Sequence, residues 1–430
     1  MYLVNPKGGQ IKGLRVHTSL KDISNNIDYV IGLVNAQAAP KLVEECAGRG
    51  VRAVHFCTAG FSETGEEEGI ELESELVEVA RRNRIRIIGP NCMGIYCPQS
   101  RLSFSPIFPK ESGPVGVISQ SGGNAIYLVR QGALRGVRFS KVISYGNACD
   151  LNESDFLEYL ADDDDTKIIA MYIEGVKDGK RFFKALQKST KKKTVILLKG
   201  GLSEGGARAV AGHTASLAGS GATWNALCKQ LGIISVDTLD EVVDVLVTIL
   251  FMPLPKGRNA VLMGGGGGAS VLITDEFEKR GLRVPALPQE ITSQIREFTP
   301  AAGNILRNPV DYSQAMMDPE SVSRTLDIIS SWGGADFLVK FVRTGQSALA
   351  AGPLSQSFPL LGEATDRKSP SLKPVAMVLE PSILPGEAEA NMALLGKCVA
   401  ARLPVYYSFA SAANAINLIL NHNYKEDESI

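Results

Sequence analysis

Short hydrophobic runs alternate with longer amphipathic segments along most of the 430-residue chain. A short apolar run bounded by glycine, proline or polar residues predicts a buried strand, and apolar residues at helical spacing over a longer stretch predict a helix. Strands that alternate with helices in this way are typical of parallel sheets with crossover helices. The pattern therefore predicts an α/β protein.

Residues 1–110 are predicted to form a Rossmann-like domain. The expected strands are Tyr2–Val4, Tyr29–Val34, Ala53–Phe56 and Ile85–Ile88. The expected helices are Pro40–Arg49 and Glu71–Arg82. A nucleotide-binding domain of this kind opens with a strand, a glycine-rich turn and a helix, whereas this chain starts on what reads as the second strand. We therefore expect the first strand, turn and helix, about 30 residues of a βαβ unit, to be missing.

Residues 111–254 are predicted to form a five-stranded flavodoxin-like domain. Proline clusters near Ser105–Gly113 and at Pro253–Gly257 predict linkers on either side of it. The expected strands include Gly113–Ser119, Phe139–Ser144, Lys167–Ile173 and Thr194–Leu198. The expected helices include Ser154–Ala161, Lys180–Lys188, Ala222–Leu231 and Leu239–Met252.

Residues 255–430 are predicted to form a second flavodoxin-like domain. When the start of the middle domain is laid on this one, Val115–Ser119 falls on Ala260–Gly264 and Gly123 falls on Gly268. This match favours two repeats of one architecture. The alternative is that any two doubly wound domains start alike. Further strands are expected at Phe337–Val342, Pro374–Leu379 and Val405–Tyr407.

Composition and charge narrow the class of function. Hydrophobic residues make up 44% of the chain and charged residues 21%, as in a globular protein, and the net charge of -1 gives no signal for nucleic acid or an anionic membrane. The most apolar stretch, Val242–Leu254, is shorter than a membrane span, and the start has no signal-peptide pattern. Seven cysteines without CxxC spacing favour reduced thiols over a metal site. We expect a cytoplasmic protein that binds small molecules and protein partners.

A lone histidine, His213, follows the strand Thr194–Leu198 on what reads as a glycine-rich loop, residues 199–219. Ligands of open α/β sheets bind at the carboxyl ends of the strands, so this histidine is expected to face the crevice. Glu174 follows the strand Lys167–Ile173 and is expected at the same edge. A carboxylate there can hold one imidazole nitrogen, leave the other as the nucleophile, and stabilise the cation that phosphorylation leaves. The alternatives are a loop histidine and an exposed glutamate without a task.

A phosphate site is predicted at Ser119, Ser121, Gly122 and Gly123. These residues lie at a strand-to-helix junction, which supplies free backbone N–H groups, the positive end of a helix and hydroxyls. A tight turn of this kind needs glycine in any case, so geometry alone remains an alternative explanation.

Two further segments follow strands. Asn91 and Cys92 follow Ile85–Ile88; no base is visible beside the cysteine, so a lining role is favoured over a nucleophile. Asn147 and Asp150 follow Phe139–Ser144 and could position phosphate or water, although turn chemistry explains them nearly as well.

Eight motifs in order resemble the alpha subunit, or alpha-like half, of the NDP-forming acyl-CoA synthetases, relatives of succinyl-CoA synthetase. They are VNPKGG (4–9), AGFSETGEEEG (59–69), GPNCMG (89–94), GVISQSGG (116–123), SYGNACD (144–150), YIEG (172–175), LLKGG (197–201) and GHTASLAG (212–219). The resemblance covers most of residues 1–255 and extends more loosely over the third domain.

The resemblance implies a phosphohistidine mechanism. In such enzymes, acyl-CoA, phosphate and a nucleoside diphosphate are interconverted with acid, coenzyme A and a triphosphate. By this resemblance His213 is the phosphorylated histidine, Glu174 is the glutamate that holds it, and the helix start at Ser121–Gly123 cradles the phosphate.

The resemblance also implies a coenzyme A site and a partner. Asn91 and Cys92 match the segment that lines the thiol end of coenzyme A, and Lys7, Asn35 and Ala36 match coenzyme-contacting segments. The Mg-nucleotide site of the family lies on an ATP-grasp domain, which the motifs of this chain do not include. We therefore expect an ATP-grasp beta subunit as partner in an oligomer.

Two other functions stay open. A catalytically incomplete module that binds coenzyme A, acyl-CoA or a protein partner is favoured by the expected loss in the first domain, and is opposed by the presence of both Glu174 and His213. A nicotinamide dehydrogenase needs a G-x-G-x-x-G after the first strand, and the sequence has no such candidate there.

Overall fold

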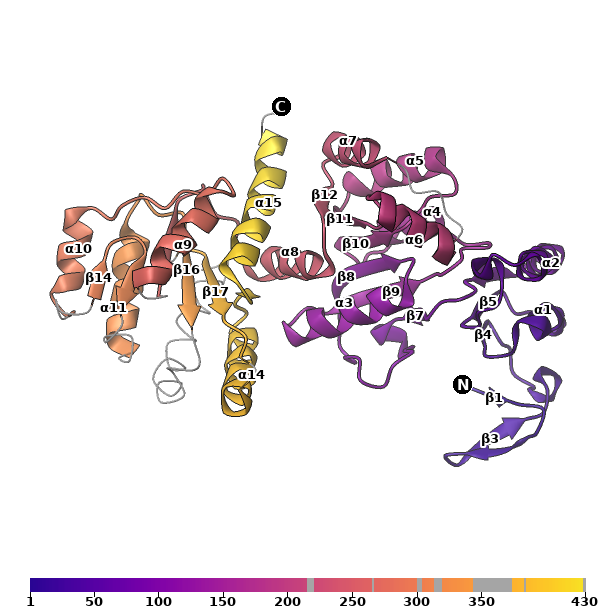
Figure 1. Ribbon diagram of the computed structural model, residues 1–430. Helices are drawn as coiled ribbons and strands as arrows, with labels where there is room; N and C mark the ends of the chain where they lie inside the picture. The colour runs from indigo at the N-terminus through magenta and orange to yellow at the C-terminus, as the bar shows by residue number, and fades with distance from the viewer. Residues whose placement is uncertain are drawn as a thin grey trace. The chain divides into compact units, whose positions relative to one another are not determined.

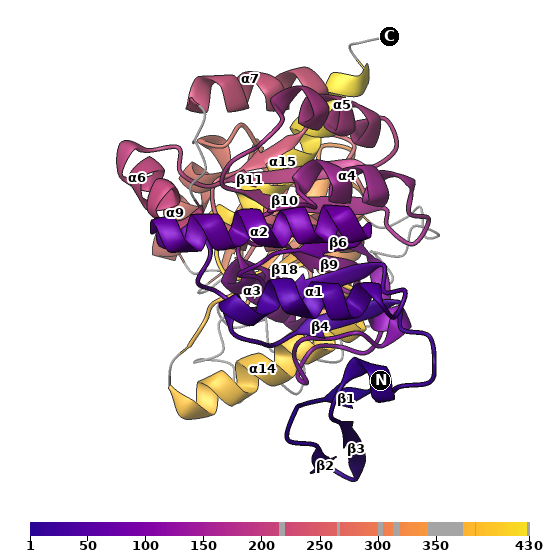
Figure 2. The ribbon, with the colours of Figure 1, turned by 90° about the vertical axis from the view of Figure 1, so that its right-hand side faces the viewer.

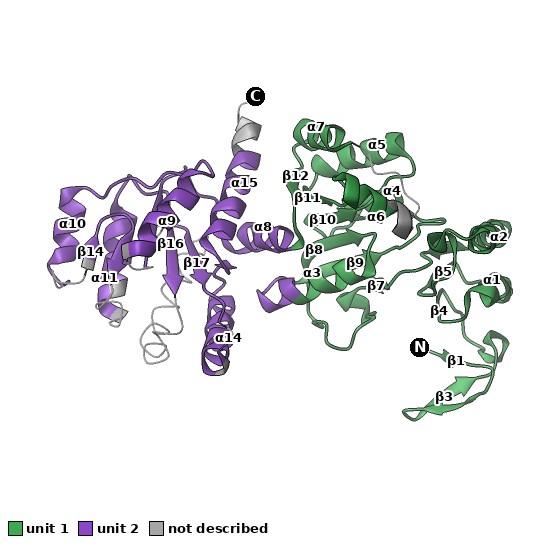
Figure 3. Cartoon of the chain, in the orientation of Figure 1, with its two compact units in different colours: residues 1–130, 138–239 green, residues 131–137, 240–430 purple. Residues whose placement is uncertain are grey.

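A computed structural model of the chain describes residues 1–214, 220–264, 267–299, 304–312, 319–342, 373–382 and 384–427. The chain divides into two compact units (Figure 3), which are unit 1, residues 1–130 with 138–239, and unit 2, residues 131–137 with 240–430. The boundaries expected at 110 and 254 divide the chain differently and remain predictions.

The N-terminal segment of unit 1 forms a small sheet of its own. Its strands, in the order β1-β3-β2, are β1 (Leu3–Val4), β2 (Gly9–Ile11) and β3 (Leu14–His17). The prediction that Tyr2–Val4 joins the parallel sheet is therefore wrong. The reason is a tight hairpin between β2 and β3, in which Lys12 and Gly13 both have positive φ. This hairpin places β3 next to β1, and the two strands pair in parallel.

The predicted parallel sheet of the first domain is present, with its strands in the order β4-β5-β6. Figure 1 shows β4 and β5 beside the helices α1 and α2. Its elements are β4 (Tyr29–Gly32), α1 (Ala39–Ala47), β5 (Ala53–Phe56), α2 (Glu67–Asn83) and β6 (Arg86–Ile88). The helices α1 and α2 pack against each other (Figure 2), and apolar side chains such as Val43, Val54, Phe56 and Leu76 form the core beneath them. Crossover helices of this kind follow from the parallel pairing.

The second sheet of unit 1 has the order β12-β11-β10-β8-β9-β7. Its strands are β7 (Gly94–Tyr96), β8 (Ser112–Ser119), β9 (Phe139–Ser144), β10 (Ile168–Ile173), β11 (Thr194–Lys199) and β12 (Ile234–Val236). The helices are α3 (Gly122–Leu134), α4 (Glu153–Asp162), α5 (Gly179–Thr190), α6 (Glu204–Thr214) and α7 (Gly221–Leu231). The five parallel strands β8 to β12 follow the flavodoxin order 2-1-3-4-5, so the switch point lies between β8 and β10.

Unit 2 repeats this architecture, with the order β14-β15-β13-β16-β17-β18 among the described residues. Its strands are β13 (Ala260–Met263), β14 (Asn304–Leu306), β15 (Val310–Tyr312), β16 (Phe337–Val342), β17 (Val375–Leu379) and β18 (Val405–Tyr406). Its helices are α8 (Leu239–Phe251), α9 (Gly267–Glu278), α10 (Gln289–Arg296), α11 (Pro319–Ser331), α14 (Pro385–Ala400) and α15 (Phe409–Asp427). In both sheets an antiparallel strand, β7 or β14, extends the edge next to the second parallel strand. The predicted α/β class and the predicted repeat are confirmed.

One predicted loop is a helix. Residues 199–219 were expected to form a glycine-rich loop, but Glu204–Thr214 form α6. Ser203 accepts a hydrogen bond from the N–H of Gly206 at 3.1 Å and so caps the first turn. Ala207, Arg208 and Ala209 follow the two glycines at the start of α6, and alanine and arginine are among the strongest helix formers.

Candidate active site

The junction between β8 and α3 exposes backbone donors. The Ser121 hydroxyl accepts a hydrogen bond from the N–H of Asn124 at 3.3 Å, and the Ser119 hydroxyl donates to the Ser121 carbonyl at 2.7 Å. Within the described residues, no hydrogen bond leaves the N–H of Gly122 or Gly123. A Cβ at Gly123 would meet only the Ser121 hydroxyl, at 3.9 Å. The helix start therefore offers open donors at the positive end of its dipole, which suits an anion.

Glu174 lies across the switch point from this junction, directly after β10, and is 4% exposed. The Gln120 side-chain carbonyl accepts hydrogen bonds from the N–H groups of Glu174 at 2.8 Å and Gly175 at 3.1 Å. The Tyr172 hydroxyl donates to Oε1 of Glu174 at 3.1 Å. The loops after β8 and β10 are thus joined by Gln120, and the carboxylate is oriented by Tyr172.

Lys199, at the end of β11, completes this edge of the sheet. Its ammonium donates to the backbone carbonyl of Glu174 at 2.8 Å and to that of Gly200, and lies 5.4 Å from the ring centre of Trp224. Burial lowers the pKa of Lys199, while the Glu174 carboxylate opposes that shift. Sequence reasoning did not assign Gln120, Tyr172 or Lys199. The available signal was their position at or just beyond the carboxyl ends of buried strands.

His213 lies in the last turn of α6, and its side chain is outside the described residues. The predicted pairing of His213 with Glu174 therefore stays a prediction. Glu174 follows β10, and α6 follows the neighbouring parallel strand β11. Both segments therefore leave the sheet at the same edge.

The loop after β6 approaches the same region from the neighbouring sheet. The N–H of Asn91 donates to the Thr58 carbonyl at 2.8 Å, and its side-chain amide donates to Oδ1 of Asn147 at 3.4 Å. Gly146 has a φ of +52°, and a Cβ there would clash with the carbonyl oxygens of Pro90 and Asn91. Only glycine permits this close approach, so the two loops are held against each other.

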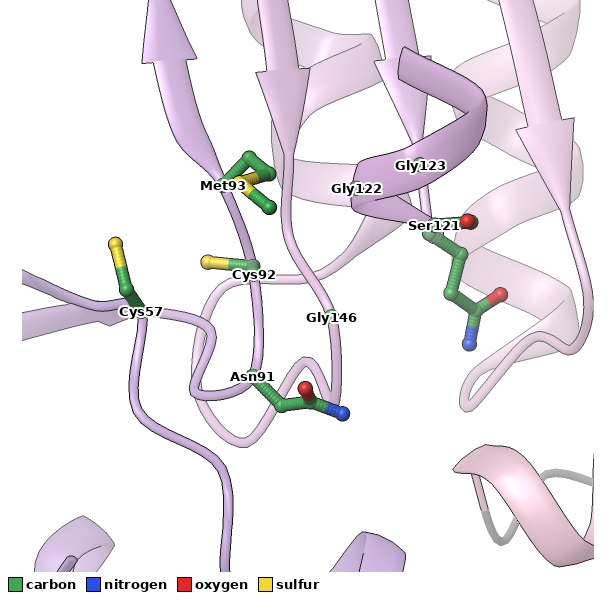
Figure 4. A pocket seen from close by; sticks show the side chains of 9 residues that line it. Cys57, Asn91, Cys92, Met93, Ser121, Gly122, Gly123 and Gly146 are labelled. Atoms are coloured by element: carbon green, nitrogen blue, oxygen red, sulfur yellow. The ribbon is translucent and has the colours of Figure 1, made fainter. Parts of the chain in front are cut away.

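A cavity of about 210 Å³ forms where these loops meet the start of α3 (Figure 4). It is lined by Cys57, Asn91, Cys92, Met93, Gln120, Ser121, Gly122, Gly123 and Gly146. The structure thus brings the two predicted groups, the phosphate site at Ser121–Gly123 and the Asn91–Cys92 segment, into one cavity.

Two other predicted residues have partners that explain them without a ligand. Asn147 donates to Oε2 of Glu73 at 2.9 Å and to Oε2 of Glu63 at 2.5 Å. Both carboxylate oxygens of Asp150 accept from Arg86, at 2.9 and 3.2 Å, and one also accepts from the N–H of Ile87 at 2.8 Å. Asp150 therefore fastens a loop to β6, and the idea that it positions phosphate or water finds no support in this geometry.

The predicted coenzyme contacts outside the cavity lie on separate segments. Asn35 caps a short helix at Ala36–Ala38, with its side-chain oxygen accepting from the N–H of Ala38 at 3.0 Å. Lys7 is exposed in the turn between β1 and β2, where its N–H donates to Oδ1 of Asn5 at 3.0 Å. None of Lys7, Asn35 and Ala36 is among the residues that line the cavity, and their roles remain predictions.

Sequence reasoning did not assign Cys57, which lines the cavity, or His55, which contacts Cys57. Cys57 lines the cavity, and its sulfur is 3.2 Å from Nε2 of His55. His55 is buried, and burial lowers its pKa to about 4. Burial also raises the pKa of both Cys57 and Cys92. Both thiols are therefore uncharged at neutral pH, which supports a lining role for Cys92.

Among the residues that the structure describes, no cluster of three or more histidine, cysteine, aspartate or glutamate side chains could hold a metal ion. None of the helices described is both long and apolar enough to cross a membrane.

Two protein-family models match the chain. A CoA binding domain matches residues 1–98, and a succinyl-CoA ligase like flavodoxin domain matches residues 112–249. The second range contains the Ser119–Gly123 junction, Glu174 and His213, and the first contains Asn91 and Cys92.

The chain is also similar in sequence to ADP-forming acetate–CoA ligases and in structure to an acetyl-coenzyme A synthetase. The alpha subunit of ADP-forming acetate–CoA ligase II from Pyrococcus furiosus is 40% identical over 339 residues, which are 79% of this chain and 73% of that protein. ADP-forming acetate–CoA ligase I from Archaeoglobus fulgidus is 37% identical over 79% of this chain, which spans only 49% of that protein. The dinucleotide-forming acetyl-coenzyme A synthetase 1 of Ca. Korarchaeum cryptofilum, solved with phosphate and ADP, superposes with a TM-score of 0.78 at 27% identity, over 99% of this chain and 89% of that one.

Proposed function

The chain belongs to the family of alpha subunits of the ADP-forming acetate–CoA ligases, and we propose that it catalyses acyl and phosphoryl transfer between coenzyme A, phosphate and a carboxylic acid. The overall reaction interconverts acyl-CoA, phosphate and a nucleoside diphosphate with acid, coenzyme A and a triphosphate. The observation that carries the proposal is the shared cavity, in which the open N–H groups of Gly122 and Gly123 lie beside Asn91 and Cys92.

Each group has a role that its chemistry supports. The N–H groups at the start of α3 and the Ser121 hydroxyl would hold phosphate as it attacks the thioester carbonyl, and coenzyme A would leave as a thiol. Asn91 and Cys92 would line the thiol end of coenzyme A. Both thiols of the cavity are uncharged, so neither competes with phosphate as a nucleophile.

We assign the second step to His213. Its imidazole would take the phosphoryl group from the acyl phosphate and release the carboxylic acid as carboxylate, and the buried Glu174 would stabilise the phosphohistidine. Tyr172, which hydrogen-bonds the carboxylate at 3.1 Å, would keep Glu174 in position. The phosphoryl group would then pass to a nucleoside diphosphate.

The nucleotide site is assigned to a partner. The sequence has no P-loop pattern, G-x-x-x-x-G-K-[ST]. We therefore propose that Mg-nucleotide binds to an ATP-grasp beta subunit. The name of the Pyrococcus relative, a subunit alpha, supports a partnership of this kind.

The test is phosphoryl transfer from a labelled triphosphate with magnesium and a candidate beta chain. A phosphoramidate is lost in mild acid and survives alkali, so label with these properties should map to the peptide that contains His213. His213→Ala should abolish the label, whereas His422→Ala, the matched change in α15, should keep it. Glu174→Gln should shorten the lifetime of the phosphohistidine.

The competing function is a binding module that holds acyl-CoA without turnover. Two results together would support it. The chain would bind coenzyme A, and none of its histidines would be labelled by a beta chain that does label another alpha subunit. Label that persists in His213→Ala would instead overturn the assignment of the carrier.

A further inference from the structure

Lys199 is a buried cation at the same edge of the sheet as Glu174. It ends β11, is 7% exposed, and contacts three segments of unit 1. Its ammonium donates to the carbonyl of Glu174, in the loop after β10, at 2.8 Å, and to the carbonyl of Gly200. It also lies 5.4 Å from the ring centre of Trp224, near the start of α7. Because α6 lies between Gly200 and Trp224 in the chain, Lys199 joins both ends of the stretch that carries His213 to the Glu174 loop.

The backbone just after β11 is closely packed. A Cβ at Gly200 would lie 2.8 Å from the Tyr172 hydroxyl, which is the group that donates to the Glu174 carboxylate. Gly201 has a φ of +77°, and a Cβ there would lie 2.7 Å from Cγ2 of Val210 in α6. The chain therefore leaves β11 directly beside the Tyr172–Glu174 pair.

The ammonium of Lys199 has weaker partners than that of Lys141, which is also buried in this sheet. Lys141 forms ion pairs with Asp163 at 2.8 Å and Asp165 at 3.2 Å. In the part of the chain that the structure describes, Lys199 forms no ion pair, and two of its three N–H donors are used on neutral carbonyls. Burial lowers the pKa of Lys199, and the Glu174 carboxylate opposes that shift. A further anion at this place would therefore stabilise the buried charge.

We propose that Lys199 is a positioning residue for the phosphohistidine, because its ammonium holds the Glu174 loop in place and supplies positive charge that offsets the phosphoryl group. The inference rests on the proposed function, which puts the phosphoryl group of His213 beside Glu174. A phosphoryl group adds a charge of about −1.5 to −2 at neutral pH. Beside a buried carboxylate that charge is repelled unless a cation lies close to both. Lys199 is hydrogen-bonded to Glu174 itself and so meets this requirement.

The test is the equilibrium of phosphoryl transfer from radiolabelled acetyl phosphate to the full chain, together with the candidate beta chain and without nucleotide. Transfer breaks the bond between phosphorus and the acyl oxygen, forms a bond between phosphorus and the imidazole nitrogen of His213, and releases acetate. The quantity measured is the ratio of acetate to acetyl phosphate at which half of the chains carry label. This ratio is the equilibrium constant of the transfer.

Two substitutions separate the charge of Lys199 from its hydrogen bonds. Lys199→Gln keeps donors for the carbonyls and removes the charge, so the ratio should fall by about tenfold or more, as for the loss of other charge-assisted contacts. Lys199→Arg keeps the charge and should stay closer to the wild-type ratio than to that of Lys199→Gln. Lys199→Met, which removes both the charge and the donors, should fall at least as far as Lys199→Gln.

Lys193→Gln is the matched control, because Lys193 stands just before the other end of β11 and has contacts of the same kind. It donates to the carbonyls of Leu160 and Asp163, and burial lowers its pKa as well. We expect Lys193→Gln to keep the wild-type ratio even where denaturant unfolding shows a loss of stability.

The outcomes separate the inference from the proposed function. A wild-type ratio in either neutral variant of Lys199 that folds, as judged by circular dichroism, would overturn the role of Lys199. So would equal falls in Lys199→Gln and Lys193→Gln, or in Lys199→Gln and Lys199→Arg, since these would show a structural effect. Absence of label from His213 in the wild type would overturn the proposed function, and the inference with it.

Discussion

At the scale of single residues, alanine substitutions at two glycines near helix starts can distinguish a loss of phosphate binding from a loss of stability. Gly123 in α3 and Gly179 in α5 both have room for a Cβ. Replacing either by alanine should leave stability unchanged or raise it by up to about 1 kcal/mol, because alanine has the higher helix propensity. Only Gly123→Ala places a methyl group where the proposed function puts the phosphate. We expect at least a tenfold loss of phosphate-dependent acyl-CoA cleavage for Gly123→Ala and none for Gly179→Ala.

Thermal unfolding of both variants, measured beside the activity, provides the control for the glycine pair. Equal activities for Gly123→Ala and Gly179→Ala would place the phosphate elsewhere. A large drop in the unfolding temperature of Gly123→Ala would mean that its glycine is structural.

His55 gives a residue-scale prediction on pH. Burial lowers its folded pKa to about 4, while the unfolded chain keeps the ordinary value near 6.5. As the pH falls, the unfolded state therefore takes up this proton at a higher pH than the folded state does. The contribution of neutral His55 to the free energy of unfolding is complete above pH 6.5 and is lost as the pH falls towards 4, by up to about 3 kcal/mol. Denaturant unfolding at pH 7 and pH 4.5 should show a smaller loss for His55→Gln than for the wild type. Parallel losses, or an imidazole resonance of His55 that titrates near pH 6.5, would contradict this account.

At the scale of elements, the cavity depends on the contact between the loops after β6 and β9. Gly146 and Gly232 both have positive φ, which costs an alanine roughly 1–2 kcal/mol. At Gly232 there is open space, whereas at Gly146 a methyl group also clashes with the carbonyls of Pro90 and Asn91. Gly146→Ala should therefore lose several kcal/mol more stability than Gly232→Ala, and should weaken coenzyme A binding. Similar unfolding midpoints for the two variants would show that the loops separate without cost.

Elements with a strong periodic pattern could be predicted from the sequence. The expected helix Lys180–Lys188 and strand Phe139–Ser144 correspond to α5 and β9. Elements whose position depends on tertiary contacts could not be predicted from the sequence. β7 is only Gly94–Tyr96, and its place is set by antiparallel pairing with β9, from Gly94 opposite Ser144 to Tyr96 opposite Val142. Helix α6 was missed because glycines in its sequence suggested a loop, although its alanines and its cap sustain a helix.

The same limit applies to the candidate site. Ser119–Gly123 and Glu174 could be placed at strand ends because the strand pattern is clear. Their connection through Gln120 could not be predicted, because a side chain that bridges the loops after β8 and β10 leaves no periodic signal. Cys57 was missed for a similar reason, since its role depends on the neighbouring His55 and on the cavity rather than on its position in a motif.

At the scale of the whole molecule, one architecture occurs twice. The order of the parallel strands is the same in the second sheet of unit 1 and in the sheet of unit 2, and each has an antiparallel strand at the same edge. The sequence contains no P-loop pattern, G-x-x-x-x-G-K-[ST]. The backbone donors at the start of α3 and the Asn91–Cys92 segment both lie in unit 1. The proposed function accordingly places the phosphate and thioester steps in unit 1 and the nucleotide on a partner chain.

We accordingly predict that the purified chain alone does not form acyl-CoA from acid, coenzyme A and a triphosphate. Addition of an ATP-grasp chain should restore turnover to the range of ordinary enzymes, about 1–1,000 per second. A stable complex of this kind should bury on the order of 2,000 Å² or more, so the two chains should elute together in size-exclusion chromatography. His213→Ala in the same complex should still co-elute with the partner while turnover is lost, which separates assembly from chemistry. Nucleotide-dependent turnover by this chain without a partner would place a nucleotide site within its own 430 residues.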